Sequence, residues 1–310
     1  MTPSLTAPRR TRTNWQLRSR QLPLGERTLV TGVVNITPDS FSDGGQFLEP
    51  ERAVEYALHL LDEGADLLDL GAESTRPGSH AAEPGFALST EEEQARLLPV
   101  LQAILKARPA TVISVDTYKS ATAQAAIAAG AEIVNDVSGL TWDPAMAATC
   151  AKLRCGVVLM HTRGRPAEWR SQPGLDRESI LPLVRDGLAA SLRAALEAGI
   201  AEESIMLDPG YGFGKRFEEN YHLLGRQAEL LALGKPLLAG LSRKSFLAKT
   251  LATLPAHTRH VPPDARETAS IAALVTAILH GASLVRVHRV RAAVEAAAIA
   301  DAVLAAQECA

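Results

Sequence analysis

The stretch EGADLLDL, residues 63–70, decides the fold, and its pattern returns as AGAEIVND at 129–136 and as HGASLVRV at 280–287. In each copy a glycine ends a helical segment, a small residue follows, and a run of branched aliphatic residues begins. A helix-to-strand turn that recurs in this way is typical of a chain in which helices alternate with parallel strands.

Short apolar runs continue this pattern along the chain, and each is continuous rather than alternating with polar residues. Such runs indicate parallel strands that are buried on both faces. We expect strands at residues 28–34, 65–71, 110–116, 132–137, 156–161, 204–208, 236–241 and 283–288. They could form an open doubly wound sheet or a closed barrel. Eight strands within a span of about 280 residues favour a single (β/α)₈ TIM barrel of the α/β class.

The composition of the 310 residues limits the possible functions. The formal net charge is only −3, from 32 basic and 35 acidic residues. We therefore expect neither nucleic-acid nor membrane-surface binding, because both need a basic excess. The sequence has 3 cysteines, too few for a disulfide framework or a zinc cluster, which favours a cytoplasmic location. Residues 1–25 are interpreted as a flexible basic tail, with a binding arm as the less favoured alternative, and residues 26–310 as the barrel domain.

Polar side chains stand at the carboxyl end of every expected strand, where the βα loops of a barrel build its active site. In chain order they are Asn35, Glu73 to Arg76, Asp116, Asn135 and Asp136, His161, Asp208, Ser242 to Lys244, and Arg286 with His288. Helix caps could explain some of them, such as Asp116. They do not explain cations at helix starts, because the helix dipole disfavours positive charge there. The set therefore predicts a binding site.

The chemistry of this set divides by charge. The cations Arg76, Lys244, Arg286 and His288 suit a phosphate or diphosphate. The carboxylates and amide of Asp116, Asn135 and Asp208 suit the N–H edge of a flat heterocycle. Asn35 offers a neutral oxygen ligand for Mg²⁺, a metal that takes few protein ligands beside substrate phosphates. We expect a pocket with a heterocycle at one end and a metal-bound diphosphate at the other.

Two glycine-containing loops accompany these residues. DPGYGFGK, residues 208–215, has neither phosphate-loop nor dinucleotide spacing. It is interpreted as a flexible turn that brings Phe213 close to a flat ligand, and a simple hinge is an equal alternative. NITPDSFSDGG, residues 35–45, is interpreted as a mobile lid that hinges at its paired glycines and uses Phe41 to exclude water.

Together these motifs resemble those of the dihydropteroate synthase family from about residue 31 to about residue 305. They are VNITPDSFSDGG at 34–45, DLGAESTRPG at 69–78, SVDT at 114–117, NDV at 135–137, LMH at 159–161, LDPGYGFGK at 207–215, SRKS at 242–245 and RVH at 286–288. The resemblance implies a TIM barrel that joins p-aminobenzoate to 6-hydroxymethyl-7,8-dihydropterin diphosphate. This transferase reaction of folate biosynthesis forms a C–N bond and releases diphosphate.

The resemblance also implies residue roles. Pterin contacts fall on Asp116, Asn135, Asp208 and Lys244, with Met160 and Phe213 on the faces of the ring. Contacts with the diphosphate-bearing substrate fall on Thr75, Arg286 and His288, and Arg76 and Ser245 would lie near diphosphate and p-aminobenzoate. The lid residues are Pro38, Phe41 and Asp43, the Mg²⁺ ligand is Asn35, and the catalytic residues are Asp43, Asp208 and Lys244. The family pattern further implies a homodimer, with residues 252–264 as a surface loop near its interface.

Two alternatives remain open. A methyltransferase module that presents methyltetrahydrofolate to a corrinoid protein would keep the heterocycle acceptors, but it would need neither the cations nor the SFSDGG lid. A non-catalytic pterin-binding relative would be expected to lose lid or cation residues, and all of them are present here.

Overall fold

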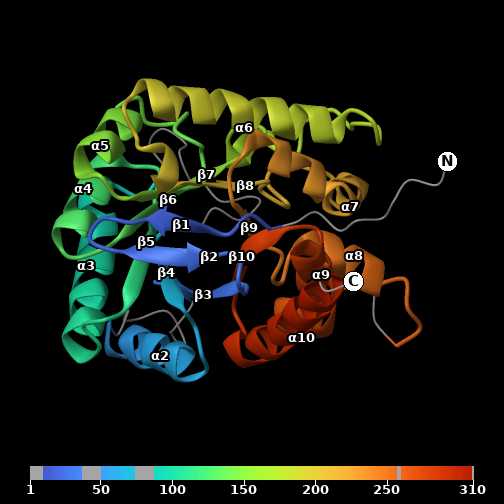
Figure 1. Cartoon of the computed structure of the whole chain (residues 1–310), viewed down its shortest axis with the longest axis horizontal. Helices are drawn as coiled ribbons and strands as arrows, with labels where there is room; N and C mark the ends of the chain where they lie inside the picture. The colour runs from blue at the N-terminus through green and yellow to red at the C-terminus, as the bar shows by residue number, and fades with distance from the viewer. Residues whose placement is uncertain (1–9, 37–49, 74–86, 257–259, 309–310) are drawn as a thin grey trace.

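The chain forms a closed parallel barrel surrounded by helices (Figure 1). The structure is a computed structural model and describes residues 10–36, 50–73, 87–256 and 260–308. Within them the strands close in the order β10-β3-β4-β5-β6-β7-β8-β9. These strands are β3 Leu29–Asn35, β4 Leu67–Gly71, β5 Val112–Asp116, β6 Ile133–Asp136, β7 Gly156–Met160, β8 Ile205–Asp208, β9 Leu237–Ala239 and β10 Ala282–Val287. Each falls at an expected run, so the TIM barrel is confirmed and the open sheet is excluded.

Helices cover the outside of this barrel. They are α2 Pro50–Asp62, α3 Thr90–Ala107, α4 Ser120–Ala128, α5 Met146–Leu153, α6 Ile180–Glu197, α7 Phe217–Gly225, α8 Ser245–Leu251, α9 Glu267–Leu279 and α10 Val290–Glu308. In the parts of the chain that the structure describes, none of these helices combines the length and apolar character needed to span a membrane.

The repeated helix-to-strand turn depends on glycine. Gly64, Gly130 and Gly281 have φ values of 103°, 112° and 92°, a region that residues with a Cβ adopt only at a cost. Each of these glycines lies in the short turn between a helix and the next barrel strand. The three similar phrases of the sequence are therefore one structural turn used three times.

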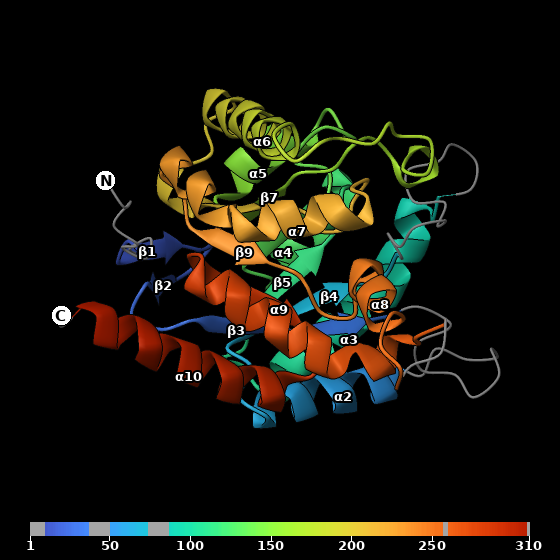
Figure 2. The same ribbon diagram turned by 90° about the vertical axis from the view of Figure 1, so that its right-hand side faces the viewer.

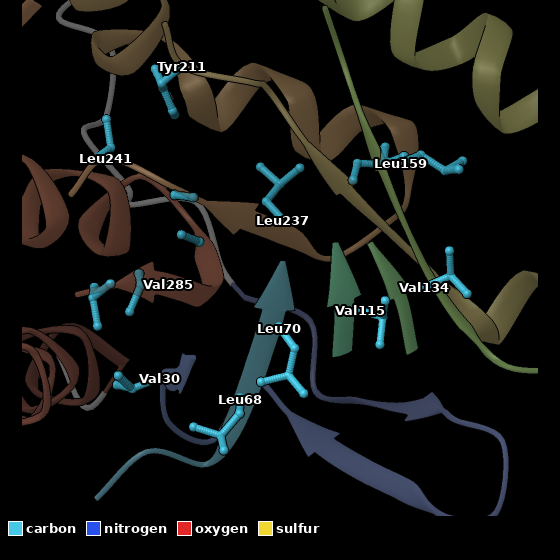
Figure 3. Close-up of a cluster of buried hydrophobic side chains, with 14 of the residues drawn as sticks. Val30, Leu68, Leu70, Val115, Val134, Leu159, Tyr211, Leu237, Leu241 and Val285 are labelled. Carbon is cyan, nitrogen blue, oxygen red and sulfur yellow. The ribbon is translucent and has the colours of Figure 1, made fainter. Parts of the chain in front are cut away.

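The main core lies between the strands and the helices. Strand residues such as Leu68, Val115 and Val134 point outward from the barrel, and Figure 3 shows them with other members of this cluster. Tyr211 is fully buried in it and donates its hydroxyl to Gln227 Oε1 at 2.8 Å. Because both faces of every strand are covered, the strands read as continuous apolar runs.

A second core fills the amino-terminal end of the barrel interior. It takes an apolar side chain from each barrel strand: Leu29, Leu67, Val112, Ile133, Val158, Met206, Leu238 and Leu284. Trp15, Leu17 and Leu24 close this end from outside the barrel. They belong to an antiparallel hairpin of β1 Thr13–Gln16 and β2 Gln21–Leu24 and to the segment that joins its strands. The hairpin lies at the left of the barrel in Figure 2 and α8 at its right.

The hairpin corrects the prediction that residues 1–25 form a flexible tail. Trp15 is 1% exposed, and its indole Nε1 donates to the carbonyl oxygen of Ser204 at 2.8 Å. Ser19 and Arg20 donate to the Glu132 carboxylate, which ties the hairpin turn to the barrel as well. Residues 10–25 are therefore part of the folded domain, because their apolar side chains complete its core. Residues 1–9 lie outside the described part of the chain.

The alternation of side chains along a strand places the functional site. On each barrel strand, the residue two positions after the one in the second core also points into the barrel, one layer closer to the carboxyl end. These residues are Thr31, Asp69, Ser114, Asn135, Met160, Asp208, Gly240 and Arg286. Most of them are polar, so the barrel interior changes from apolar to polar within two residues along each strand, toward its carboxyl end.

Candidate active site

A cavity of about 400 Å³ opens at the carboxyl end of the barrel. Its walls come from the ends of the strands and from the loops after β7, β8 and β9. The lining residues are Asn35, Gly71, Glu73, Asp116, Trp169, Gly212, Phe213, Gly240, Ser242, Arg243, Lys244, Ser245, Pro263, Arg266, Arg286 and His288. This is the end at which the barrel fold assembles its catalytic residues.

Asp69 joins three strands beneath this cavity. It is 1% exposed, and its Oδ1 accepts a hydrogen bond from Ser114 Oγ at 2.6 Å. Its Oδ2 accepts from Asn135 Nδ2 at 3.0 Å and from Arg286 Nε at 2.5 Å. One buried carboxylate therefore binds β5, β6 and β10 together, and its desolvation is offset by a cation and two further donors.

Arg286 links Asp69 to a second carboxylate. Its Nη2 donates to Asp116 Oδ2 at 2.9 Å. Burial raises the pKa of Asp116 to about 7, with Arg286 opposing the rise and Asp69 adding to it. Burial acts to lower the pKa of Arg286, but Asp69 and Asp116 together raise it above its usual value. Arg286 is therefore charged, and Asp116 changes its charge near neutral pH.

Asp208, Lys244 and Phe213 form the other side of the site. The Nζ of Lys244 lies 4.1 Å from the centre of the Phe213 ring, within the range of a cation–π contact. Burial lowers the pKa of Lys244 to about 8, and Asp208 opposes this. Burial raises the pKa of Asp208, against the Gly210 N–H that donates to its Oδ1 at 2.7 Å. Trp169 contacts Phe213 edge to face, with ring centres 5.2 Å apart, and holds that ring in place.

The loop from Asp208 to Lys215 is held by buried hydrogen bonds, which corrects its interpretation as a flexible turn. The Nζ of Lys215 donates to the carbonyl oxygens of Gly210, His161 and Phe213 at 2.7, 3.1 and 3.3 Å. At Gly210 φ is 67°, and a Cβ there would lie 2.0 Å from the carbonyl oxygen of His161. Glycine is required for close packing at this position, and the loop presents Phe213 from a fixed backbone.

Comparison with known proteins places this site in a family. The model of the family described as "Pterin binding enzyme" matches residues 31–288. Dihydropteroate synthase of Mycobacterium leprae is 43% identical over 267 residues, which cover 86% of this chain and 90% of that protein. The chain belongs to the dihydropteroate synthase family.

Solved dihydropteroate synthases of Xanthomonas albilineans agree with this chain in structure. The structure with 4-aminobenzoic acid has a TM-score of 0.82 at 40% identity, and the one with 7,8-dihydropteroate has 0.80 at 38%. Each alignment covers 94% of this chain and 99% of the Xanthomonas albilineans chain.

Membership of the dihydropteroate synthase family confirms the function expected from the sequence: the chain is a transferase that makes dihydropteroate. The relatives favour the synthase over the methyltransferase module and over a non-catalytic pterin-binding protein. The cavity is consistent with this function, because its walls combine carboxylate acceptors with several cations.

The structure brings most of the predicted site residues together. Asn35, Asp116, Phe213, Lys244, Ser245, Arg286 and His288 line the cavity. Asn135, Met160 and Asp208 are 5%, 4% and 6% exposed, and they belong to the interior polar layer beneath it. Thr75, Arg76 and the lid residues Pro38, Phe41 and Asp43 lie outside the described residues, so their roles stay predictions.

Three residues of the site have no individual role among the expectations from sequence: Asp69, Glu73 and Trp169. Asp69 lies in the motif DLGAESTRPG, and a carboxylate inside an apolar strand is itself a signal of a special role. Glu73 accepts hydrogen bonds from Lys119 Nζ at 2.6 Å and from Tyr118 at 2.9 Å, so it connects the ends of β4 and β5. Trp169 had no signal, because its contact with Phe213 joins positions 44 residues apart in sequence.

Proposed function

We propose that the cavity binds 6-hydroxymethyl-7,8-dihydropterin diphosphate with its pterin ring toward the interior polar layer and its diphosphate toward the mouth. The proposed pterin contacts are Asp116, Asn135, Asp208 and Lys244, with Met160 and Phe213 against the ring faces. Arg286 and His288 would contact the diphosphate, and Ser245 would lie near p-aminobenzoate. The observation that carries this proposal is the grouping of buried oxygen acceptors around two cations, Lys244 and Arg286, at one end of the barrel.

The acceptors match the chemistry of the pterin edge. A pterin presents ring N–H and amino groups in one plane, and carboxylates accept strong hydrogen bonds from such donors. Asp116 and Asp208 come from strands on different sides of the barrel, so a flat ring between them could contact both. A ligand that was only an anion would have no use for these two carboxylates.

We propose a dissociative substitution for the reaction. The C–O bond between the exocyclic methylene and the diphosphate breaks first, and the dihydropterin delocalises the positive charge left on that carbon. The carboxylate of Asp208 would stabilise this charge, while Arg286 and His288 would stabilise the departing diphosphate. The amine of p-aminobenzoate then forms the C–N bond and releases its proton to solvent.

Mg²⁺ fits the residues at the mouth. Asn35 ends β3 and lines the cavity beside the proposed diphosphate contacts. In the described part of the chain, no group of three or more His, Cys, Asp or Glu side chains could hold a metal ion. A site of one amide oxygen completed by substrate phosphates and water suits Mg²⁺. When bound, the ion would neutralise charge on the leaving diphosphate.

Two further proposals concern the protein as a whole. A homodimer is proposed from the family resemblance, and the exposed apolar residues Ile299 and Val303 on α10 offer surface for an interface. Light scattering after size-exclusion chromatography would test it, and a monomer at micromolar concentration would contradict it. The cytoplasmic location stays a prediction, supported by the unpaired, buried Cys150 and Cys155.

The Asp208→Asn variant tests the proposed mechanism. The purified protein would receive the dihydropterin diphosphate, p-aminobenzoate and Mg²⁺, and dihydropteroate would be followed over time. The variant keeps the shape of the side chain but loses the charge that stabilises the cation, so turnover should fall at least about 100-fold. Affinity for inorganic diphosphate should change less than about threefold. Equal losses in turnover and diphosphate affinity would contradict the dissociative step.

A further inference from the structure

Asp69 is the most connected carboxylate of the barrel interior, and neither the proposed mechanism nor the residue roles above use it. Its two oxygens accept three hydrogen bonds, from Ser114, Asn135 and Arg286. Two of these donors are proposed substrate contacts. It is buried one layer below the cavity and does not line it.

We propose that Asp69 is a positioning residue that determines which atom of Asn135 meets the pterin. An asparagine side chain can present either a donor or an acceptor, depending on how its amide is turned. The Asp69 carboxylate can only accept, so it holds the Nδ2 of Asn135 at 3.0 Å. The amide turns as one unit, so its Oδ1 then lies away from Asp69 and is available to accept from a ligand.

This orientation gives three of the four proposed polar contacts with the pterin the same character, and only Lys244 donates. With Asn135 fixed as an acceptor, it joins Asp116 and Asp208 as the third oxygen group facing the ring. A ligand edge made of N–H groups is favoured, and an edge that presents a carbonyl oxygen or an unprotonated nitrogen meets an oxygen instead. Asp69 thus contributes to specificity without touching the substrate. The inference rests on the proposed contact between Asn135 and the pterin.

Asp69 fixes Arg286 by the same means. The guanidinium donates from Nε to Asp69 and from Nη2 to Asp116, so two carboxylates set its plane. Asparagine at position 69 could not replace this arrangement. Its single oxygen would have to serve three donors, and its amide nitrogen would face at least one of them.

The test is a double-mutant cycle with Asp69→Asn and Asn135→Ala, read as affinity for 6-hydroxymethyl-7,8-dihydropterin without its diphosphate. Titration calorimetry would give the affinity of each variant. In the native background Asp69→Asn should weaken binding about 10- to 100-fold, the effect expected when a buried hydrogen bond to a charged group is lost. In the Asn135→Ala background the same change should cost less than about threefold, because no amide remains to be turned.

The matched control is Ser114→Ala, which removes one donor to Asp69 and leaves its contacts with Asn135 and Arg286 intact. It should change pterin affinity by less than about threefold. The KM for p-aminobenzoate should stay within about twofold in Asp69→Asn, because that substrate meets neither group. If the asparagine variant does not fold, Asp69→Ser enters the same cycle, since its hydroxyl can still accept one hydrogen bond.

The outcomes separate the inference from the proposed function. If Asp69→Asn lowers pterin affinity by the same factor in both backgrounds, Asp69 does not act through Asn135 and the inference fails. An Asn135→Ala variant that binds the pterin as tightly as the native protein overturns the proposed contact, and the inference with it. A loss confined to the native background supports both.

Discussion

Replacing Trp15 with alanine should destabilise the barrel without changing its chemistry. The indole ring is 1% exposed and closes an apolar layer to which all eight barrel strands contribute. Truncating a buried aromatic side chain to alanine costs about 3–5 kcal/mol. The lost hydrogen bond to the Ser204 carbonyl adds about 1 kcal/mol. We expect a total loss near 4–6 kcal/mol in the free energy of unfolding.

Urea unfolding followed by circular dichroism would measure this loss. Trp15→Phe keeps most of the apolar contact but not the indole N–H, so it should lose only about 1–2 kcal/mol. Gln21→Ala, an exposed change in the same hairpin, should stay within about 0.5 kcal/mol. The hairpin lies at one end of the barrel and α8 at the other (Figure 2), and α8 begins at Ser245, which lines the cavity. The value of kcat/KM of the folded Trp15→Ala variant should therefore be unchanged. A loss below about 1 kcal/mol for Trp15→Ala would refute the view that the hairpin completes the core.

Three further predictions concern residues of the site. In the proposed pterin site, Asp116 offers both of its carboxylate oxygens as acceptors only when it is ionised. Its pKa of about 7 means that the KM for the dihydropterin diphosphate should rise about tenfold per pH unit as the pH falls below 7; a flat profile from pH 8 to 5.5 would contradict this. The same raised pKa should make Asp116 lower folding stability progressively as the pH rises from about 4 to about 7, since the folded state keeps the proton longer. Gly210→Ala should lose more than about 3 kcal/mol of stability, because its Cβ would lie 2.0 Å from a carbonyl oxygen. Thermal unfolding would measure this loss. Gly234 has a similar φ of 71° and open space around it, so the control Gly234→Ala should lose only about 1 kcal/mol. Equal losses in the two variants would show that backbone strain, not packing, requires glycine at position 210.

The strands and the mouth of the site could be predicted from sequence because their signals are local. A buried parallel strand is an apolar run in which the side chains of both faces are covered, and the first polar residue after it marks its carboxyl end. Asp116 and Asp208 each end their strand, and Lys244 follows β9 at the mouth of the cavity.

The role of Asp69 and the presence of the hairpin were not predicted from the sequence, for different reasons. The partners of Asp69 lie 45, 66 and 217 residues away in sequence, so its role depends on the closure of the barrel. The hairpin did leave a local signal. Trp15 and Leu17 alternate with polar residues, and Leu22 and Leu24 are likewise two positions apart. This spacing is a period-two pattern typical of two short strands. The five arginines of the first 25 residues concealed it by making the segment look solvated.

The hairpin also bears on the order in which the chain folds. Its residues are synthesised before any barrel strand, yet Trp15 binds a carbonyl 189 positions later and packs in one cluster with Leu238 and Leu284. The hairpin cannot bury its apolar face until the last strands have closed the barrel. During synthesis the apolar face of the hairpin is exposed to water or to transient partners. Its docking is a late event, because it closes a loop of 189 residues between Trp15 and Ser204. A segment made before every barrel strand thus finds its place only after the barrel has assembled, and its burial stabilises that barrel.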